Sequence, residues 1–183
     1  MSQRNVKFEP VARDFFPTPA EGVTALLPHL DPGTRFVEPF AGNGALVSHL
    51  EAAGHTCVAA YDIVPQAPGI SRLDALDITQ ADIAGAQFAI SNPPWTRSAM
   101  TPLLSRLLSL GIPCWMLIDA GWTHTARAFP LTRRVSAIVS VGRLRFIPGS
   151  PFSGTKDCAW HLLQPDHEGP ASFYIRRGKE ASR

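Results

Sequence analysis

Short apolar runs alternate with amphipathic stretches along most of the chain, and this spacing predicts a regular succession of strands and helices. Six apolar runs of strand-like composition predict strands at residues 35–39, 56–63, 87–92, 114–120, 135–147 and 156–164. Between them, apolar residues recur at helical spacing and predict helices at 20–30, 43–54, 98–111 and 121–129. Because strands and helices alternate, we expect an α/β protein whose mostly parallel central sheet carries helices on both faces.

The last part of the chain departs from this alternation. The strands predicted at 135–147 and 156–164 follow one another without a helix, so we expect antiparallel pairing at one end of the sheet. The irregular stretches 64–70 and 147–156 predict mobile loops. In sheets of this kind, ligands bind beyond the carboxyl ends of the strands, where the strand order reverses.

Length and composition indicate one globular domain. The chain has 183 residues, of which 45% are hydrophobic and 17% charged, and one core of this size buries roughly two-thirds of the unfolded surface. We expect a single domain over 1–183 with flexible ends at 1–13 and 170–183. No apolar run approaches the ~20 residues of a membrane span. The first residues lack the apolar segment of a signal peptide, so we expect a cytoplasmic location and no membrane partner.

Cysteine and histidine spacing does not indicate a metal site. The three cysteines lie far apart without a CxxC pair, and the six histidines form neither HxxxH nor HExxH. A metal site of the common kinds needs such pairs to bring its ligands together. We therefore expect no bound metal and no disulfide framework.

Charge is distributed unevenly along the chain. Residues 1–82 carry five basic and ten acidic side chains, whereas residues 83–183 carry twelve and five. The stretch 120–156 holds six bases and no acid, which is typical either of a surface for a polyanion or of a solvated loop face. The bases that we expect to contact nucleic-acid phosphates are Arg97, Arg143, Arg145 and Lys156. Strand alternation over 135–147 would put Arg143 and Arg145 on one face.

The first chemical motif runs from Phe36 to Gly44, where a predicted buried strand enters a glycine turn before a helix. Gly42 and Gly44 let the backbone approach a ligand closely. Asp62 stands at the end of the next strand, where a carboxylate can accept hydrogen bonds from both hydroxyls of a ribose. A nucleoside-containing cofactor is therefore expected.

The charge of this half of the chain favours one such cofactor over others. A pyrophosphate would meet Glu38 and an acidic half of the chain, which is an unfavourable field. S-adenosylmethionine carries a sulfonium and an ammonium group and no phosphate. It is therefore the cofactor that we expect.

The second motif is Ser91-Asn92-Pro93-Pro94-Trp95, directly after a predicted strand. A structural interpretation exists, because Asn-Pro-Pro also makes a strand-ending turn. In a site, the Pro93 carbonyl and the Asn92 side chain would hold both hydrogens of an exocyclic amine and favour the geometry in which its lone pair is free. Trp95 would offer a flat surface for the planar group that carries the amine.

Together these motifs resemble the class I S-adenosylmethionine-dependent amino-methyltransferases, especially small phage- or prophage-type DNA N6-adenine methyltransferases. The resemblance covers about residues 14–164 and implies the Rossmann-like class I methyltransferase fold. The order of the two motifs, cofactor before catalysis, is similar to the gamma-type arrangement of that family. The residues that match its catalytic motif are Asn92, Pro93, Pro94 and Trp95.

The resemblance also implies a set of cofactor contacts from four segments. These residues are Phe16, Pro17, Thr18, Glu38, Pro39, Phe40, Gly42, Gly44, Asp62, Ile63, Asp74 and Asp77. For the acid that would accept a hydrogen bond from the cofactor's adenine amine, Asp74 and Asp77 are alternatives. Asp74 is favoured because Leu76 then matches an apolar position of the family.

The expected activity is methyl transfer to the N6 amine of adenine in DNA, with the base extruded from the stack. The residues after Trp95 are needed to complete the sheet, so no separate target-recognition domain is expected. Related families use an NPP motif on RNA base amines or on protein glutamine amides, and tryptophan at the fourth position distinguishes them poorly. A non-catalytic nucleic-acid-binding module is the alternative from another class.

Overall fold

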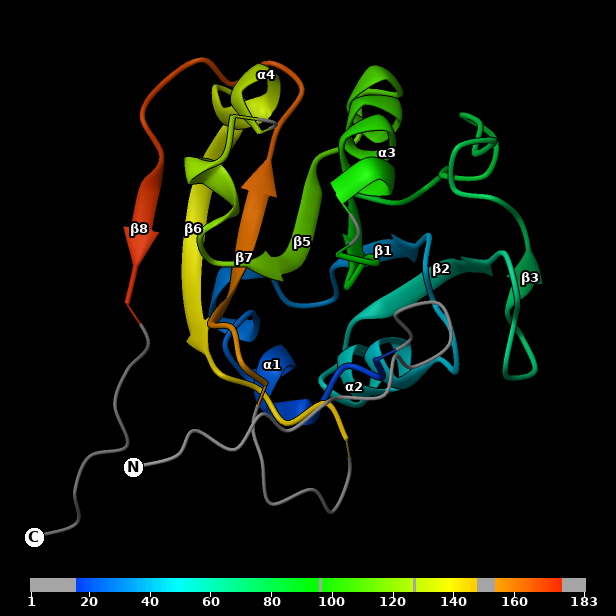
Figure 1. Ribbon diagram of the computed structural model, residues 1–183. Coiled ribbons are helices and arrows are strands. Elements are labelled where there is room, and N and C mark those ends of the chain that lie inside the picture. The colour runs from blue at the N-terminus through cyan, green and yellow to red at the C-terminus, as the bar shows by residue number, and fades with distance from the viewer. Residues whose placement is uncertain (1–15, 96, 127, 148–153, 176–183) are drawn as a thin grey trace, which may run out of the picture.

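The computed structural model describes residues 16–95, 97–126, 128–147 and 154–175. Within them, eight strands form one mixed sheet covered by helices on both faces (Figure 1). The strands are β1 Arg35–Glu38, β2 Thr56–Asp62, β3 Ser71–Arg72, β4 Phe88–Ser91, β5 Cys114–Asp119, β6 Val135–Gly142, β7 Cys158–Leu163 and β8 Ser172–Tyr174. The helices are α1 Ala20–Thr24, η2 Leu27–His29, α2 Ala45–Ala52, α3 Arg97–Ser109, η3 Trp122–His124 and α4 Phe129–Thr132.

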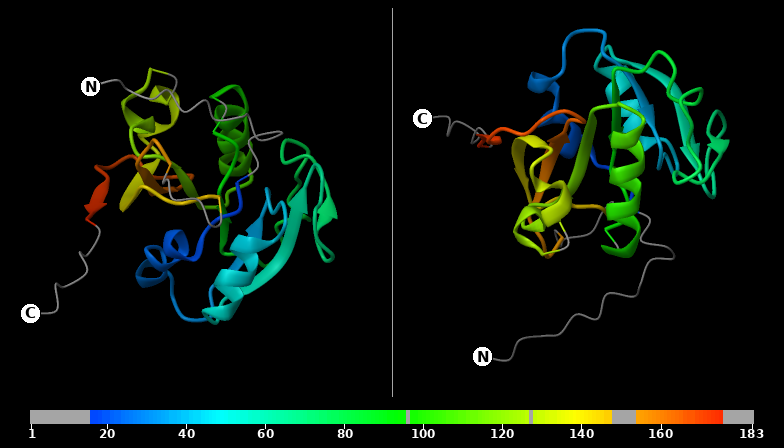
Figure 2. Two further views of the ribbon diagram at one scale, coloured as in Figure 1. Left: turned by 60° about the horizontal axis from the view of Figure 1, so that its bottom comes forward. Right: turned by 90° about the horizontal axis from the view of Figure 1, so that it is seen from above.

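The strand order is β3-β2-β1-β4-β5-β7-β6-β8. Strands β1 to β5 pair in parallel, which confirms the mostly parallel sheet. Strand β7 is antiparallel to both β5 and β6, as the missing helix between the last predicted strands indicated. Strands β3 and β8 lie at opposite edges of the sheet (Figure 2). The order reverses between β1 and β4, so the segments after these two strands meet at one edge of the sheet.

Each face of the sheet has its own apolar core. Consecutive residues of β1 point to opposite faces, so Phe36 packs beneath α1 and α2 while Val37 packs beneath α3 and α4. Leu50 of α2 belongs to the first core and Leu104 of α3 to the second, and both are fully buried. The two helical layers stand on opposite sides of the sheet in Figure 1. The carboxyl ends of the strands are thereby held rigidly between two cores.

Three predicted elements differ from the observed ones. The helix predicted at 20–30 is divided into α1 and η2, with Pro28 in the first turn of the second piece. The helix predicted at 121–129 is replaced by the short η3 and α4. The strand predicted at 135–147 ends at Gly142, whose φ of 82° leaves the extended region. Arg143 and Arg145 therefore follow the strand and do not lie on it.

The ends of the predicted domain are described in part. Strand β8 pairs in parallel with β6 at residues 172–174, so the sheet reaches into the stretch expected to be a flexible end. Residues 1–13, and the segment 148–153 of one predicted mobile loop, lie outside the described residues. None of the described helices has the length and apolar character that a membrane crossing requires.

Candidate active site

The glycine turn after β1 is fastened to the end of β2 by one carboxylate. The two oxygens of Asp62 each accept a backbone N–H, from Gly42 at 2.7 Å and from Val64 at 2.8 Å. Gly42 and Gly44 adopt φ values of 53° and 77°, which side chains with a Cβ rarely tolerate. Because a carboxylate oxygen has two lone pairs, Asp62 can still accept hydrogen bonds from a ligand. The predicted turn and the predicted acid are thus brought together.

Glu38 lies at the base of this turn and is buried, with 2% of its surface exposed. The Ser91 hydroxyl donates a long hydrogen bond of 3.4 Å to Oε1 of Glu38. Oε2 is buried as well and has no hydrogen-bond partner among the described residues. Burial raises the pKa of the Glu38 carboxyl well above its usual value, and the nearby charge of Asp62 adds to the increase. The hydrogen bond between Ser91 and the buried Glu38 therefore connects the residue before Asn92 to the cofactor motif.

The side-chain amide of Asn92 is oriented by a segment far away in the sequence. Its nitrogen Nδ2 donates a hydrogen bond of 3.1 Å to the backbone carbonyl of Phe16. Since the amide nitrogen is directed to Phe16, the oxygen Oδ1 is the end that can accept a hydrogen bond from a ligand. Pro93, which follows, is buried and has no backbone N–H, so the turn is stiff.

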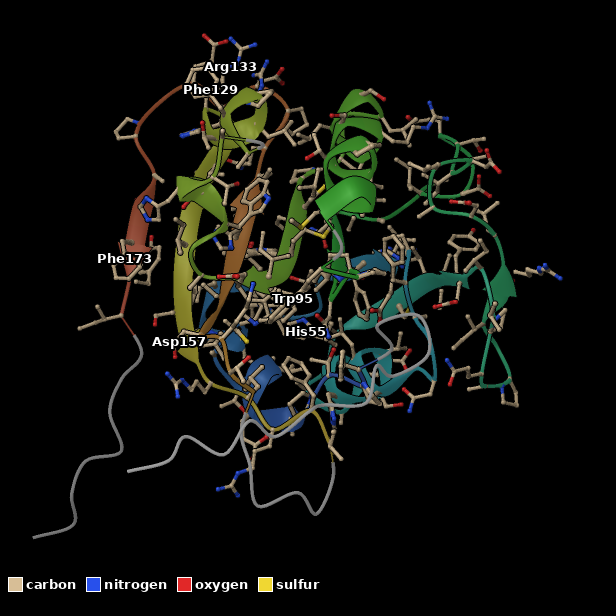
Figure 3. The ribbon with its side chains drawn as sticks, in the orientation of Figure 1. His55, Trp95, Phe129, Arg133, Asp157 and Phe173 are labelled. Carbon is tan, nitrogen blue, oxygen red and sulfur yellow. The ribbon has the colours of Figure 1, made fainter. Side chains whose placement is uncertain are left out.

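Trp95 is held in one orientation by a hydrogen bond and by a ring contact. Its indole N–H donates to the carbonyl of Leu117 on β5 at 3.1 Å. Its ring meets the edge of Phe146 at a centroid distance of 5.9 Å and an angle of 89°. Phe146 in turn contacts Phe16 at 5.7 Å. Figure 3 shows Trp95 in the middle of the molecule, between the two helical layers.

Phe146 is a residue of this site that the sequence analysis did not single out. It shares strand-like alternation with the buried Leu144, so an apolar core position would have been the natural interpretation. The structure instead places it between Phe16 and Trp95, so that three aromatic side chains from three distant segments meet. The local signal in the sequence was its position just after the exposed Arg143 and Arg145.

The other predicted cofactor contacts lie on the loops that follow β2 and β3. Asp74 is partly buried, and its Oδ1 accepts the N–H of Leu76 at 3.0 Å, whereas Asp77 is exposed. Ile63, Val64 and Leu76 are large apolar residues with 49%, 42% and 48% of their surface exposed. Because β2 and β3 are paired neighbours, these loops share one edge of the sheet. Exposed apolar side chains at such an edge suit a flat apolar ligand.

The candidate phosphate-binding residues are partly neutralised by acids. Lys156 Nζ lies 2.6 Å from Oδ2 of Asp119, and Arg143 Nε lies 3.6 Å from Oδ1 of Asp157. These two acids bracket the acid-free stretch 120–156. Arg145 is exposed and makes no ion pair within the described part of the chain.

Two described basic residues of this stretch, Arg133 and Arg143, lie at opposite ends of β6. Arg133 precedes β6 and Arg143 follows it, and the eight residues of this strand span roughly 25 Å. Figure 3 shows Arg133 far from Asp157, the partner of Arg143. Arg97 begins α3, but its side chain lies outside the described part. Among the described residues, no group of three or more His, Cys, Asp or Glu side chains could hold a metal ion.

Comparisons with known proteins identify the fold. No family sequence model matches the chain, and no curated protein matches it in sequence. Solved structures share its architecture. A type I restriction-modification methyltransferase subunit from Streptococcus thermophilus superposes with a TM-score of 0.56 and 12% identity, over 90% of this chain and 49% of that one.

Two RNA methyltransferases superpose similarly. The Pyrococcus abyssi tRNA (uracil-54, C5)-methyltransferase, solved with S-adenosyl-L-homocysteine, gives a TM-score of 0.55 and 17% identity over 82% of this chain and 40% of that one. The 23S rRNA methyltransferase ErmE gives 0.52 and 14% over 84% and 71%. At these identities the likeness extends to the fold, which is the Rossmann-like fold of class I methyltransferases.

Proposed function

We propose that this protein transfers a methyl group from S-adenosylmethionine to the exocyclic N6 amine of adenine in DNA. The observation that carries the proposal is the hydrogen bond from Asn92 Nδ2 to the Phe16 carbonyl, which leaves the amide oxygen for an incoming amine. Asn92 directly follows Ser91, whose hydroxyl donates a hydrogen bond to the buried Glu38 at the base of the glycine turn. An amine acceptor therefore lies beside a candidate cofactor pocket.

The residues of the pocket fit S-adenosylmethionine, whose chemical contribution when bound is a methyl group activated on a sulfonium. The unpartnered Oε2 of Glu38 offers a buried acceptor for the ammonium group. Asp62 stands where ribose hydroxyls would reach it, with lone pairs remaining on both oxygens. Ile63 and Leu76 offer apolar contacts to the adenine ring. Asp74 is the better candidate for the adenine amine, because it is partly buried and Asp77 is exposed.

The role of the chain in the reaction is to position the amine. Asn92 Oδ1 and the Pro93 carbonyl accept its two hydrogens, and this favours the pyramidal nitrogen whose lone pair can attack. Trp95, fixed through Leu117, supports the ring that carries the amine. The proton that the nitrogen loses on methylation passes to solvent, since no strong base is needed for a nitrogen that becomes cationic as it is methylated.

Adenine in DNA is proposed because an exocyclic amine on a flat ring matches both the acceptor pair and Trp95. The proposal also follows the motif resemblance over about residues 14–164. One superposed structure is a methyltransferase subunit of a type I restriction-modification system, and this supports a DNA substrate. At Arg143 and Lys156, phosphates could replace the carboxylates of two exposed ion pairs, each of which contributes about 0–1 kcal/mol. Arg145 is exposed and has no ion pair in the described part of the chain.

A methylation assay tests the proposal directly. Purified protein is incubated with radiolabelled S-adenosylmethionine and, in parallel, single-stranded DNA, duplex DNA, RNA or a protein extract, and the products are hydrolysed for mass spectrometry. We expect N6-methyladenine in DNA, and none with the Asn92→Ala variant. Label in RNA or in glutamine, with none in DNA, would reject the substrate. No transfer to any of the four would reject the activity and favour a binding module.

An RNA base amine is the second candidate substrate. It is favoured by the likeness to two structures described as tRNA and 23S rRNA methyltransferases. The neutralised cations offer few free positive charges for a long duplex, whereas a single-stranded loop presents its bases without unpairing. The RNA arm of the same assay distinguishes this candidate from DNA.

A further inference from the structure

The carboxyl group of Glu38 is a buried acid without a cationic partner among the described residues. Its Oε2 has no hydrogen bond, and no Lys, Arg or His forms an ion pair with it in the described part of the chain. The groups that act on it are Ser91 of β4, through the 3.4 Å hydrogen bond, and Asp62 of β2. Its own charge acts on the Cys57 thiol of β2. None of these groups carries a positive charge.

An ionised carboxylate is costly in such a place. Transfer of a charge from water into a protein interior is compensated only by pairing or by hydrogen bonds to the charged form. In the part of the chain that the structure describes, the Glu38 carboxyl has a single long hydrogen bond. The negative charge of Asp62 at the end of the neighbouring strand adds repulsion. Both effects raise the pKa of Glu38 and favour its neutral, protonated form in the cofactor-free protein.

A cationic ligand would reverse this balance. The proposed cofactor carries an ammonium group that remains charged at neutral pH. Placed against Oε2, it would supply the opposite charge that Glu38 lacks and would favour the carboxylate. The neutral acid and the ammonium would become a carboxylate–ammonium pair, and one proton would leave for the solvent.

We propose that Glu38 is protonated in the cofactor-free protein and releases its proton when the ammonium group of the cofactor binds. This rests on the proposed function. It makes cofactor affinity dependent on pH, with binding that strengthens up to tenfold for each unit of pH as long as Glu38 is protonated before binding. The cofactor pocket would thus remain uncharged at Glu38 until a ligand with the correct cationic end arrives. A neutral nucleoside has no charge to pair with Glu38, so it would gain no affinity from this residue.

Titration calorimetry of the full chain tests this without turnover. S-adenosylhomocysteine, which keeps the ammonium and cannot donate a methyl group, is titrated at one pH in two buffers of different ionisation enthalpy. We expect the observed enthalpies to differ by the amount that corresponds to release of about one proton. 5′-Methylthioadenosine, which lacks the amino-acid end, is expected to bind without proton release. The affinity of S-adenosylhomocysteine is then measured between about pH 6 and about pH 7.5, below the loss of the ammonium proton.

The Glu38→Gln variant is the matched control, because it keeps the shape and removes the titration. We expect it to bind S-adenosylhomocysteine more weakly, without proton release and without the pH dependence. Binding to the wild-type protein without proton release would overturn this inference and leave the proposed function intact. Proton release that persists in the variant, or that accompanies 5′-methylthioadenosine, would overturn it as well. Absence of any binding to the wild-type protein would instead reject the cofactor and the proposed function together.

Discussion

The side-chain nitrogen of Asn92 donates a hydrogen bond to the backbone carbonyl of Phe16, which lies 76 residues earlier in the chain. A segment before the first strand therefore sets which end of this amide is left to accept a hydrogen bond from a ligand. The ring of Phe16 also contacts the ring of Phe146, and Phe146 contacts Trp95. The acceptor for the amine and the surface for its ring are positioned by one set of contacts.

Removal of the Asn92 side chain should separate catalysis from cofactor binding. In Asn92→Ala we expect methyl transfer to fall about 100-fold or more, the scale for a lost hydrogen-bonding group at a reacting centre. Cofactor affinity should remain nearly unchanged, since Glu38 and Asp62 are untouched. Turnover with labelled cofactor and calorimetry provide the two readouts. Gln87→Ala is the control, because this amide binds the backbone of Arg35 at the other end of the sheet. Loss of cofactor binding in Asn92→Ala would show that its assigned role is incorrect.

The Trp95 ring and its hydrogen bond should have different consequences. Trp95→Phe keeps an aromatic surface but leaves the Leu117 carbonyl without its donor, which costs about 1 kcal/mol of stability. Trp95→Ala removes the stacking surface, worth about 1–3 kcal/mol per base. We therefore expect KM for the nucleic acid to increase roughly 10- to 100-fold in the alanine variant and much less in the phenylalanine variant. Equal effects of the two variants in steady-state kinetics would contradict a stacking role.

Release of Arg143 from its acidic partner should strengthen nucleic-acid binding. Asp157→Asn removes the carboxylate 3.6 Å from the guanidinium and leaves both side chains exposed. We expect affinity to increase roughly two- to fivefold, the scale of an exposed ion pair, with a steeper dependence on salt. Fluorescence anisotropy with a labelled oligonucleotide at several salt concentrations measures both. Asp166→Asn makes the same charge change in the turn that follows β7, and it should have little effect. An equal gain in both variants would mean that only net charge matters.

His161 should make the protein less stable in acid. Burial lowers the pKa of this histidine from 6.5 to about 4, against the opposing effects of its hydrogen bond to Ala159 and of the Asp119 charge. The unfolded chain therefore takes up a proton before the folded protein does, so stability is complete above about pH 6.5 and is lost as pH falls toward 4. The full difference between the pKa values of the unfolded and folded states corresponds to about 3 kcal/mol in the free energy of unfolding.

The His161→Phe variant isolates this effect. It keeps a ring in contact with Trp122, which lies 5.8 Å away and edge-on, and removes the titrating group. Urea unfolding at several values of pH should show a free energy of unfolding that falls less in the variant than in the wild-type protein between pH 6.5 and 4. Parallel curves for the two proteins would assign the acid sensitivity to other groups.

Elements with a strong local pattern were predictable from the chain alone. The strand over 114–120 is nearly all apolar, as a strand buried on both faces must be, and β5 occupies Cys114–Asp119. The strand over 135–147 alternates beyond its true end, because residues 143–146 keep the exposure pattern of a strand after Gly142 has left the sheet. The helix over 121–129 has helical spacing but forms only two short pieces, η3 and α4.

Local pattern in the amino-acid chain was sufficient to place the glycine turn and Asn92 at the same edge, because parallel strands bring their carboxyl ends together. It could not show that Asn92 is oriented by Phe16, that Phe146 joins Trp95, or that Lys156 and Arg143 are paired with Asp119 and Asp157. These contacts join residues between 14 and 76 positions apart, and they depend on which strands are neighbours and on where each side chain points. Neighbouring residues in the chain carry no information on either, so only the packed sheet determines them.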